Sequence, residues 1–220
     1  MYAPSHLANE FVSSSLERRL EDRIGGGAYR EVYREGNLAI KVLKPYVKKD
    51  YGLFSINFPA FLYTKIQFGI EDFNKFEYDN YRQMIGLVPL ELRDSFAKII
   101  RVEQNQNGSL SINELVTDAD GCVSKTLKQY GEVRNSKFWE RFNELEQLFL
   151  SNNISLFDIN SENILVKELE NGDTTPVLVD YKRFGTRTYP FQFGLLTESG
   201  VRKKIKRRFA RIRDSYRPFS

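Results

Sequence analysis

Alternating apolar and polar positions predict β-strands in the first half of the chain. Residues 29–35 alternate weakly, a Gly-Asn turn follows, and residues 38–43 form a short apolar run that contains one lysine. Residues 96–102 and 110–116 resemble two further strands joined by a polar turn. We therefore expect the first half to be rich in β-structure.

Helical spacing of apolar residues occurs in three places. Residues ~71–85 lack glycine and space their apolar side chains at helical intervals. The clearest amphipathic pattern covers residues 136–150, with Asn135 or Ser136 as its predicted N-cap. The segment 201–217 carries Lys and Arg on one face and an apolar stripe on the other, made of Val201, Ile205, Phe209, Ile212 and Tyr216. We expect a helix in each segment.

The order of the predicted elements indicates the fold class. Two more strand-like runs, residues 163–166 and 177–179, lie between the second and third predicted helices. Strands that precede most of the helices are typical of an α+β fold. We predict a single α+β domain with a β-rich N-terminal lobe over about residues 14–117 and a small helical C-terminal lobe over about residues 118–220.

The composition of the chain argues against several classes of protein. The 220 residues are 41% hydrophobic and 28% charged, as in an ordinary globular protein. No apolar run approaches the ~18 residues that a membrane span needs, and residues 1–20 have no apolar signal core. The single cysteine, Cys122, excludes an intrachain disulfide and predicts a cytoplasmic protein. The single histidine, His6, argues against His-based metal sites and catalytic triads.

Positive charge is concentrated at the C-terminal end. The net charge is +4, but residues 201–220 hold nine Lys or Arg against Asp214, a local charge of +8 that leaves −4 for the rest. In one interpretation, the apolar stripe docks on the C-terminal lobe and the basic face is simply hydrated. In the other, the basic face meets an anionic partner, such as the inner-membrane surface or a lipid-linked phosphosugar. Nucleic acid is disfavoured because no recognised reading motif accompanies the charge.

Two segments of candidate chemistry lie in the predicted strands. Gly25, Gly26 and Gly27 would let backbone N–H groups approach phosphate oxygens without interference from a Cβ atom. Lys41, at an inward position of an apolar strand, needs an anionic partner because a buried unpaired ammonium is costly. Gly-rich turns and lysines that extend to water also occur in ordinary sheets, so neither feature is specific alone.

A third segment places oxygen-bearing side chains at the ends of two strands. Asp158 is followed five residues later by Asn163, and Asp180 comes directly after residues 177–179. This arrangement can bring one carboxylate to a hydroxyl and two oxygen ligands to Mg²⁺. Alternatively, Asp158 and Asn163 simply cap a turn between strands.

The order and spacing of these segments match the signature set of protein kinases: a Gly-rich loop, a strand lysine, an Asp-x4-Asn motif and a second Asp after a strand. More narrowly, residues 153–166 and 175–180, with Gly185 and the basic run 207–211, resemble the YrbL family, small bacterial kinase-like proteins linked to the PhoP regulatory network. The resemblance covers about residues 24–213. A more distant one connects the chain to kinases of lipopolysaccharide-core heptose. Both imply a truncated protein-kinase-like fold.

The resemblance to kinases implies a role for each matching residue. Asp158 corresponds to the catalytic carboxylate, while Asn163 and Asp180 correspond to the Mg²⁺ ligands. Lys41 corresponds to the lysine that contacts the α- and β-phosphates of ATP. The residues assigned to nucleotide binding beside Lys41 are Gly25, Gly26, Gly27, Val32, Glu114 and Val116.

The acid that would pair with Lys41 is the least defined position. We choose Glu77 in the predicted helix, with Glu71 as the rival. Glu77 lies farther along the chain from Lys41 than is usual in kinases, so the aromatic-rich residues 46–76 would form an insertion. We interpret that stretch as core rather than as a ligand platform.

Departures from the kinase pattern bear on the substrate. Arg30 stands where kinases carry the third loop glycine, and Leu156 and Phe157 stand where they carry the His-Arg pair before the catalytic Asp. Asn160 replaces the lysine that follows this Asp by two residues, and Lys182 replaces the glycine after the metal-binding Asp. Asn160 removes a γ-phosphate contact typical of Ser/Thr protein kinases, and Lys182 or Arg183 would supply the missing charge. Only 40 residues follow Asp180, too few for a standard activation loop and peptide-docking subdomain.

These residues favour ATP- and Mg²⁺-dependent transfer of the γ-phosphoryl group to a hydroxyl of a sugar or other small molecule, with heptose of the lipopolysaccharide core as one example. Asp158 would orient the acceptor and accept its proton. The alternatives are a Ser/Thr protein kinase and a pseudokinase that serves as a nucleotide-binding regulatory module. The joint presence of Asp158, Asn163 and Asp180 argues against a pseudokinase, because a scaffold needs none of them.

Overall fold

The computed structural model describes residues 23–26, 30–43, 72–105, 108–154, 157–181 and 197–218. The chain divides into two compact units, which are described separately. The first contains residues up to Lys75 together with Ile100–Leu115, and the second contains Phe76–Ile99 together with the chain from Val116 onward. The two-lobe boundary expected near residue 117 stays a prediction.

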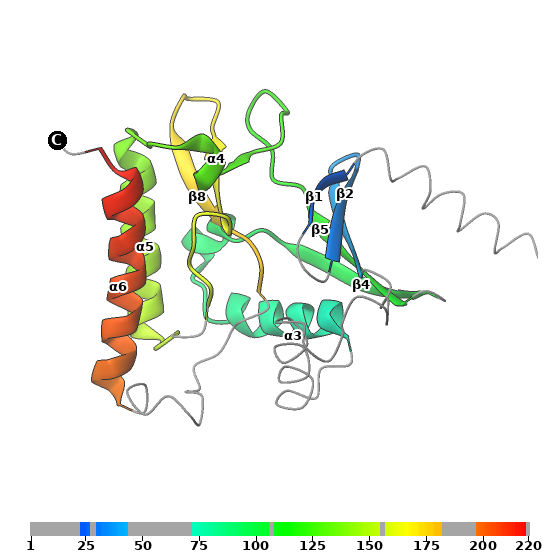
Figure 1. Cartoon of the computed structure of the whole chain (residues 1–220), viewed down its shortest axis with the longest axis horizontal. Helices are drawn as coiled ribbons and strands as arrows, with labels where there is room; N and C mark the ends of the chain where they lie inside the picture. The colour runs from blue at the N-terminus through cyan, green and yellow to red at the C-terminus, as the bar shows by residue number, and fades with distance from the viewer. Residues whose placement is uncertain are drawn as a thin grey trace, which may run out of the picture. The chain divides into compact units, whose positions relative to one another are not determined.

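The first unit is built on a five-stranded sheet with the order β1-β2-β3-β5-β4 (Figure 1). Its strands are β1 (Arg23–Gly26), β2 (Arg30–Glu35), β3 (Leu38–Leu43), β4 (Ile99–Asn105) and β5 (Gly108–Glu114). One face buries Tyr33, Ile40 and Ile112, which lie directly opposite one another on three neighbouring strands. The predicted strands are confirmed with two shifts in their bounds. Strand β4 begins at Ile99, whereas Phe96 makes an isolated bridge to Leu178, and β5 ends at Glu114 and not at residue 116.

Helix α3 (Phe73–Ile85) confirms the helix predicted over residues 71–85. Asp72 caps it, because its Oδ1 accepts hydrogen bonds from the backbone N–H groups of Asn74 and Lys75 at 2.9 and 3.1 Å. Burial by itself would raise the pKa of Asp72, but hydrogen bonds from Ser109, Lys75, Gln104 and Asn74 outweigh it, so the pKa is lowered.

The second unit combines helices with a three-stranded sheet in the order β6-β7-β8. Its remaining elements are the 3-10 helix η2 (Leu90–Ser95), β6 (Lys125–Thr126), α4 (Leu127–Tyr130), α5 (Ser136–Ser151), β7 (Ile164–Glu168), β8 (Thr174–Leu178) and α6 (Glu198–Tyr216). The predicted helix 136–150 and its Asn135 cap are confirmed, since Asn135 Oδ1 accepts from the backbone N–H of Lys137 at 2.9 Å. The mixed elements of both units establish an α+β protein.

Helices α5 and α6 lie side by side and contribute many of the core residues of the second unit (Figure 1). The Phe209 ring of α6 lies 4.8 Å from that of Phe142 and 5.4 Å from that of Phe149, measured between centroids. Val201, Ile205 and Ile212 are also buried, so the apolar stripe of α6 packs inside the unit. This agrees with the interpretation in which the stripe docks on the C-terminal lobe. None of the described helices is long and apolar enough to cross a membrane.

Candidate functional site

Three residues predicted to bind ATP lie in one row across the first unit's sheet. Gly25 of β1 is paired with Val32 of β2, which is paired with Lys41 of β3, and Lys41 is paired with Ser111 of β5. Directly opposed residues of antiparallel strands project from the same face of a sheet. The row therefore brings the hairpin of β1 and β2, called the glycine hairpin below, together with Val32 and Lys41 on one face of the sheet.

The face that carries Lys41 is lined by polar side chains. Ser111 is fully buried and Asn113, two residues along β5 and therefore on the same face, is 5% exposed. The Asn113 amide donates to the backbone carbonyls of Ser111 and Ala39, at 2.9 and 3.2 Å. Lys41 itself is partly buried. Glu114 is paired with Leu38, so its side chain belongs to the opposite face of the sheet.

The glycine hairpin has structural as well as candidate functional constraints. A Cβ atom added at Gly26 would lie 3.3 Å from the Arg30 carbonyl oxygen and 2.9 Å from the end of the Arg23 side chain. Arg30, at the position of the third loop glycine of kinases, is buried and donates to Asn74 Oδ1 at 3.1 Å. Arg30 thus fixes the start of α3 to β2. Gly27 lies outside the described residues, as do Glu71, Leu156, Lys182 and Arg183.

In the second unit, the β7–β8 hairpin brings Asp158, Asn163 and Asp180 together. Ile164 is paired with Leu178, and the next residue pair continues the ladder, with the Val179 N–H donating to the Asn163 carbonyl at 3.0 Å. Asp180 follows directly. The Asn163 side-chain amide donates to the backbone carbonyl of Asp158 at 3.1 Å. All three residues therefore lie at one end of the hairpin, and Asn163 Oδ1 is left as the candidate metal ligand.

The backbone at Asp180 is held in an unusual conformation. Its φ of 69° falls in the left-handed region, which Asp tolerates better than most non-glycine residues. Such conformations require the surrounding structure to hold them and are concentrated at functional sites. The left-handed turn redirects the chain as it leaves β8, so that Asp180 and Tyr181 do not extend the strand.

Tyr181, the next residue, is held at both of its backbone polar groups by α3. Its N–H donates to Glu77 Oε1 at 3.0 Å, and its carbonyl accepts from Asn80 Nδ2 at 2.8 Å. Its hydroxyl donates to the Ala97 carbonyl at 2.8 Å. Glu77 is fully buried and Asn80 is 6% exposed. Whether Glu77 also pairs with Lys41 stays a prediction.

One face of α3 thus carries buried polar side chains at i, i+3 and i+6: Asn74, Glu77 and Asn80. Asn74 donates to the backbone carbonyls of Ser109 and Lys41, at 2.8 and 3.4 Å. Within the first unit, Asn74 therefore holds the backbone at Lys41. Within the second unit, Glu77 and Asn80 hold the backbone of Tyr181, the residue after Asp180. We did not predict roles for Asn74 and Asn80 from the sequence. Their helical spacing with Glu77, on a face where apolar residues would be usual, is the signal that could have indicated them.

Phe157, which replaces the arginine of kinases before the catalytic Asp, is a core residue. It is 1% exposed, and its ring lies 5.8 Å from Tyr181 and 5.4 Å from Phe149. Arg208 of α6 donates to its backbone carbonyl. The residues next to Asp158 and Asp180 are therefore in ring contact, and α6 supports the loop that carries Asp158.

Asn160, where kinases carry a lysine, caps the turn before β7, a role that the capping interpretation had given to Asp158 and Asn163. Its Oδ1 accepts from the backbone N–H groups of Glu162 and Asn163, at 2.9 and 3.1 Å. The cap of this turn is therefore Asn160, while Asn163 binds across the turn to Asp158.

Val116, which was predicted to contact the nucleotide, is a buried residue of the second unit. Its carbonyl accepts a hydrogen bond from the Ser124 N–H at 3.0 Å.

Metal binding at this site would depend on few protein ligands. Within the described ranges, no group of three or more His, Cys, Asp or Glu side chains is suited to hold a metal ion. Asn163 and Asp180 supply one amide oxygen and one carboxylate. Mg²⁺ commonly binds through one or two protein oxygens and completes its six positions with water and substrate phosphates. The donor set fits Mg²⁺ bound together with a nucleotide.

The fold and site together define an α+β protein with a Gly-rich hairpin, a strand lysine and an Asp/Asn/Asp cluster at a hairpin end. The chain belongs to the YrbL family: the sequence profile described as "PhoP regulatory network protein YrbL" matches residues 17–217. No curated protein matches the chain.

Proposed function

We propose that the protein is an ATP- and Mg²⁺-dependent phosphotransferase of the kinase-like class. The observation that supports this most is the convergence of Asp158, Asn163 and Asp180 at one end of the β7–β8 hairpin. Phosphoryl transfer requires a carboxylate for the acceptor hydroxyl and oxygen ligands for the metal, and these three side chains supply both.

In this proposal, Asn163 Oδ1 and Asp180 would hold Mg²⁺, which would supply positive charge to the phosphates. Asn163 Nδ2 donates to the Asp158 carbonyl, so the side chain is held with its oxygen available as a ligand. Asp158 receives the acceptor hydroxyl and accepts its proton. The clamp on Tyr181 by Glu77 and Asn80 fixes the peptide that follows Asp180.

We assign the binding of the ATP phosphates to residues of the first unit. Backbone N–H groups of the glycine hairpin would contact phosphate oxygens, Val32 would belong to the segment that covers ATP, and Lys41 would bind the α- and β-phosphates. The row Gly25, Val32 and Lys41 supports this assignment, because one ligand can reach all three residues on one face. Glu77 is the proposed carboxylate partner of Lys41.

The proposed acceptor is a hydroxyl of a sugar, glycolipid or other small molecule. Asn160 is committed to the turn before β7 and offers no positive charge to a γ-phosphate, unlike the lysine of Ser/Thr protein kinases. Heptose of the lipopolysaccharide core is one acceptor of this class.

The proposal is tested by transfer of ³²P from γ-labelled ATP to fractionated bacterial extract. Asp158→Asn should lower the transfer rate by about two orders of magnitude or more, the size of a general-base contribution. The matched control is Asp79→Asn, which changes an exposed carboxylate of α3 outside the site. Transfer by Asp158→Asn at the wild-type rate would refute the assignment of the catalytic carboxylate.

A nucleotide-binding regulatory module is the second candidate. It is favoured by the family's description as a regulatory network protein and by the burial of Phe157 where kinases carry a loop-binding arginine. This candidate predicts Mg-ATP binding that depends on Lys41 and Asp180, but no transfer to any fraction. The two candidates are therefore separated by the same assay.

A further inference from the structure

Apart from the half-buried Lys204, the basic side chains of α6 fall into two sets with different environments. Arg208 and Arg213 point into the unit: Arg208 donates to the Phe157 carbonyl, and Arg213 lies 2.6 Å from the buried carboxylate of Glu146. The outer basic face consists of the exposed side chains Arg202, Lys203, Lys206, Arg207 and Arg211. Only the first set makes these contacts with the interior of the unit.

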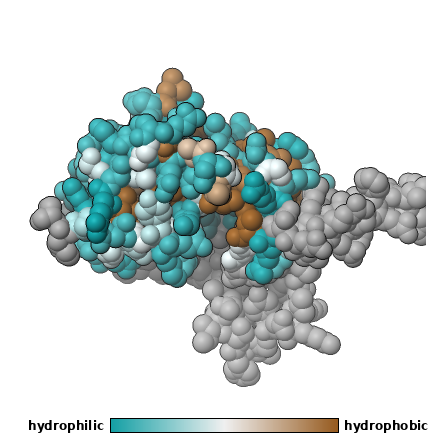
Figure 2. All heavy atoms as spheres, turned by 90° about the horizontal axis from the view of Figure 1, so that it is seen from above, coloured by the Kyte–Doolittle hydropathy of each residue, from teal (hydrophilic) through white to brown (hydrophobic). Residues whose placement is uncertain are grey.

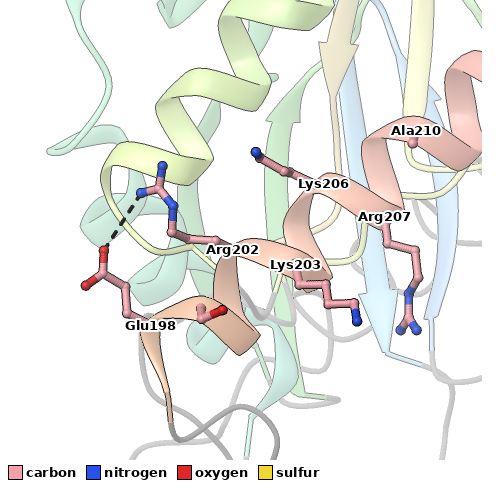
Figure 3. A pocket seen from close by; sticks show the side chains of 7 residues that line it. Glu198, Arg202, Lys203, Lys206, Arg207 and Ala210 are labelled. Atoms are coloured by element: carbon pink, nitrogen blue, oxygen red, sulfur yellow. Dashed lines mark ion pairs between the residues drawn. The ribbon is translucent and has the colours of Figure 1, made fainter.

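Four residues of the outer basic face line an open hollow of about 810 Å³ together with Glu198, Ser199 and Ala210 (Figure 3); the four are Arg202, Lys203, Lys206 and Arg207. Lys203 and Arg207, one helical turn apart, extend in the same direction from α6, and Ala210 lies beyond Arg207 along the helix. Among the described residues, the acid that approaches this face is Glu198, whose carboxylate is 3.8 Å from Arg202. The face is therefore strongly cationic and incompletely neutralised.

Charge of this density has a physical consequence. Arg202 and Lys206, like Lys203 and Arg207, are like charges at i and i+4, which repel one another on a helix. An anionic partner would relieve the repulsion. From Arg202 to Arg211 the face extends about 14 Å along the helix axis, longer than one phosphate group. An array of anionic groups complements it better than a single small anion.

We propose that the outer basic face of α6 docks on the surface of an anionic lipid bilayer through charge alone. Insertion of the helix is excluded because the apolar stripe of Val201, Ile205 and Phe209 is already packed in the core. The face carries no aromatic side chain to stack on bases and no Asn or Gln to read base edges, which disfavours nucleic acid. Hydrophilic residues also dominate the described surface drawn in Figure 2, where hydrophobic residues emerge only in small areas.

The proposal does not depend on nucleotide binding, and the test uses the full chain. The protein is sedimented with vesicles of equal parts phosphatidylglycerol and phosphatidylcholine, and with vesicles of phosphatidylcholine alone. The face variant removes four charges through Lys203→Gln, Lys206→Gln, Arg207→Gln and Arg211→Gln. The matched control removes four exposed charges elsewhere in the same unit through Lys125→Gln, Lys128→Gln, Arg134→Gln and Lys137→Gln.

Wild type and the matched control should both sediment with the anionic vesicles at low salt and stay in solution with neutral ones. Binding should weaken steeply as salt rises past about 0.1 M, where the screening length is about 10 Å. The face variant should lower the partition coefficient by two to three orders of magnitude, since each basic residue near an anionic surface contributes about fivefold.

Two results would overturn the proposal. One is equal loss of vesicle binding in the face variant and in the matched control, because the effect would then follow net charge and not α6. The other is absence of vesicle binding while mixed-sequence duplex DNA or RNA binds and the face variant loses that binding. If the fourfold face variant melts below wild type, the single variants Lys203→Gln and Arg207→Gln should each show a partial loss of about fivefold.

Discussion

Replacing Asn80 with alanine would remove the side chain that holds the carbonyl of Tyr181. The lost hydrogen bond is 2.8 Å long, and Asn80 is 6% exposed, so water has little access to replace it. A buried carbonyl left without its donor destabilises a protein by about 1–3 kcal/mol. In a chain of this size, each kcal/mol lowers the melting temperature by about 2–4 °C.

Asn80→Asp would be the sharper change. It preserves the shape of the side chain but replaces the amide donor with a carboxylate oxygen facing the Tyr181 carbonyl. At neutral pH, we expect it to destabilise the fold more than Asn80→Ala does, because two acceptors then face each other in a buried site. Both variants are compared with Asp79→Ala, which removes an exposed side chain from the same helix.

The positioning role is tested by the Mg²⁺ dependence of nucleotide binding. If Asn80 helps to hold Asp180 in its left-handed conformation, Asn80→Ala should raise the Mg²⁺ concentration needed for half-maximal stabilisation by ATP. Saturating Mg²⁺ should restore part of the effect, which a purely structural role would not allow. An unchanged melting temperature would refute the energetic argument. An unchanged Mg²⁺ dependence would refute the positioning argument.

Three further predictions concern stability. Phe209→Ala should destabilise the fold by about 3–5 kcal/mol, measured by urea unfolding, because a fully buried ring that contacts two others is removed. Arg213→Ala should destabilise the fold by about 3–5 kcal/mol, since it leaves Glu146 buried without its partner. Lys203→Ala should change the stability by no more than about 0.5 kcal/mol. Similar losses for both variants would contradict the division of α6 into inward arginines and an outer basic face. Asp72→Ala should weaken the α3 cap by about 0.5–2 kcal/mol at neutral pH. Because the folded pKa of Asp72 is lowered, the contribution of its charge is complete above its unfolded pKa of about 3.9 and is lost as pH falls through the folded pKa. A difference from wild type that does not shrink in acid would contradict this.

The elements predicted best are those whose pattern is local. The α5 helix follows from apolar residues at helical spacing and an asparagine cap, and both are read within one segment. Strand β1 (Arg23–Gly26) was not predicted, because a four-residue segment with two glycines shows no alternation. The two-residue β6 and the four-residue α4 were not predicted either; α4 depends on the capping box between Thr126 and Gln129, and β6 depends on pairing with β7.

The candidate site likewise combines features that a local sequence pattern predicts with features that depend on residues far apart in the chain. That Asn163 and Asp180 lie at strand ends follows from apolar runs next to them in the sequence. The hydrogen bond from Asn80 to Tyr181 joins residues 101 positions apart, and that from Arg208 to Phe157 joins residues 51 apart, so no local pattern indicates them. The basic helix illustrates a third case, because the sequence shows its charge but only packing distinguishes the inward arginines from the outer basic face.

Binding of Mg-ATP tests the central claim most directly. The measurement is the melting temperature of the protein with and without millimolar Mg-ATP, for wild type, Lys41→Ala, Asp180→Asn and the control Asp79→Asn. Mass action predicts a stabilisation of about 2.7 kcal/mol when ATP is at 100 times its Kd. Wild type and the control should show the full shift, Lys41→Ala a smaller one, and Asp180→Asn a shift that no longer depends on Mg²⁺. Identical melting curves of the wild-type protein with and without Mg-ATP would contradict the proposed nucleotide site and the function that rests on it.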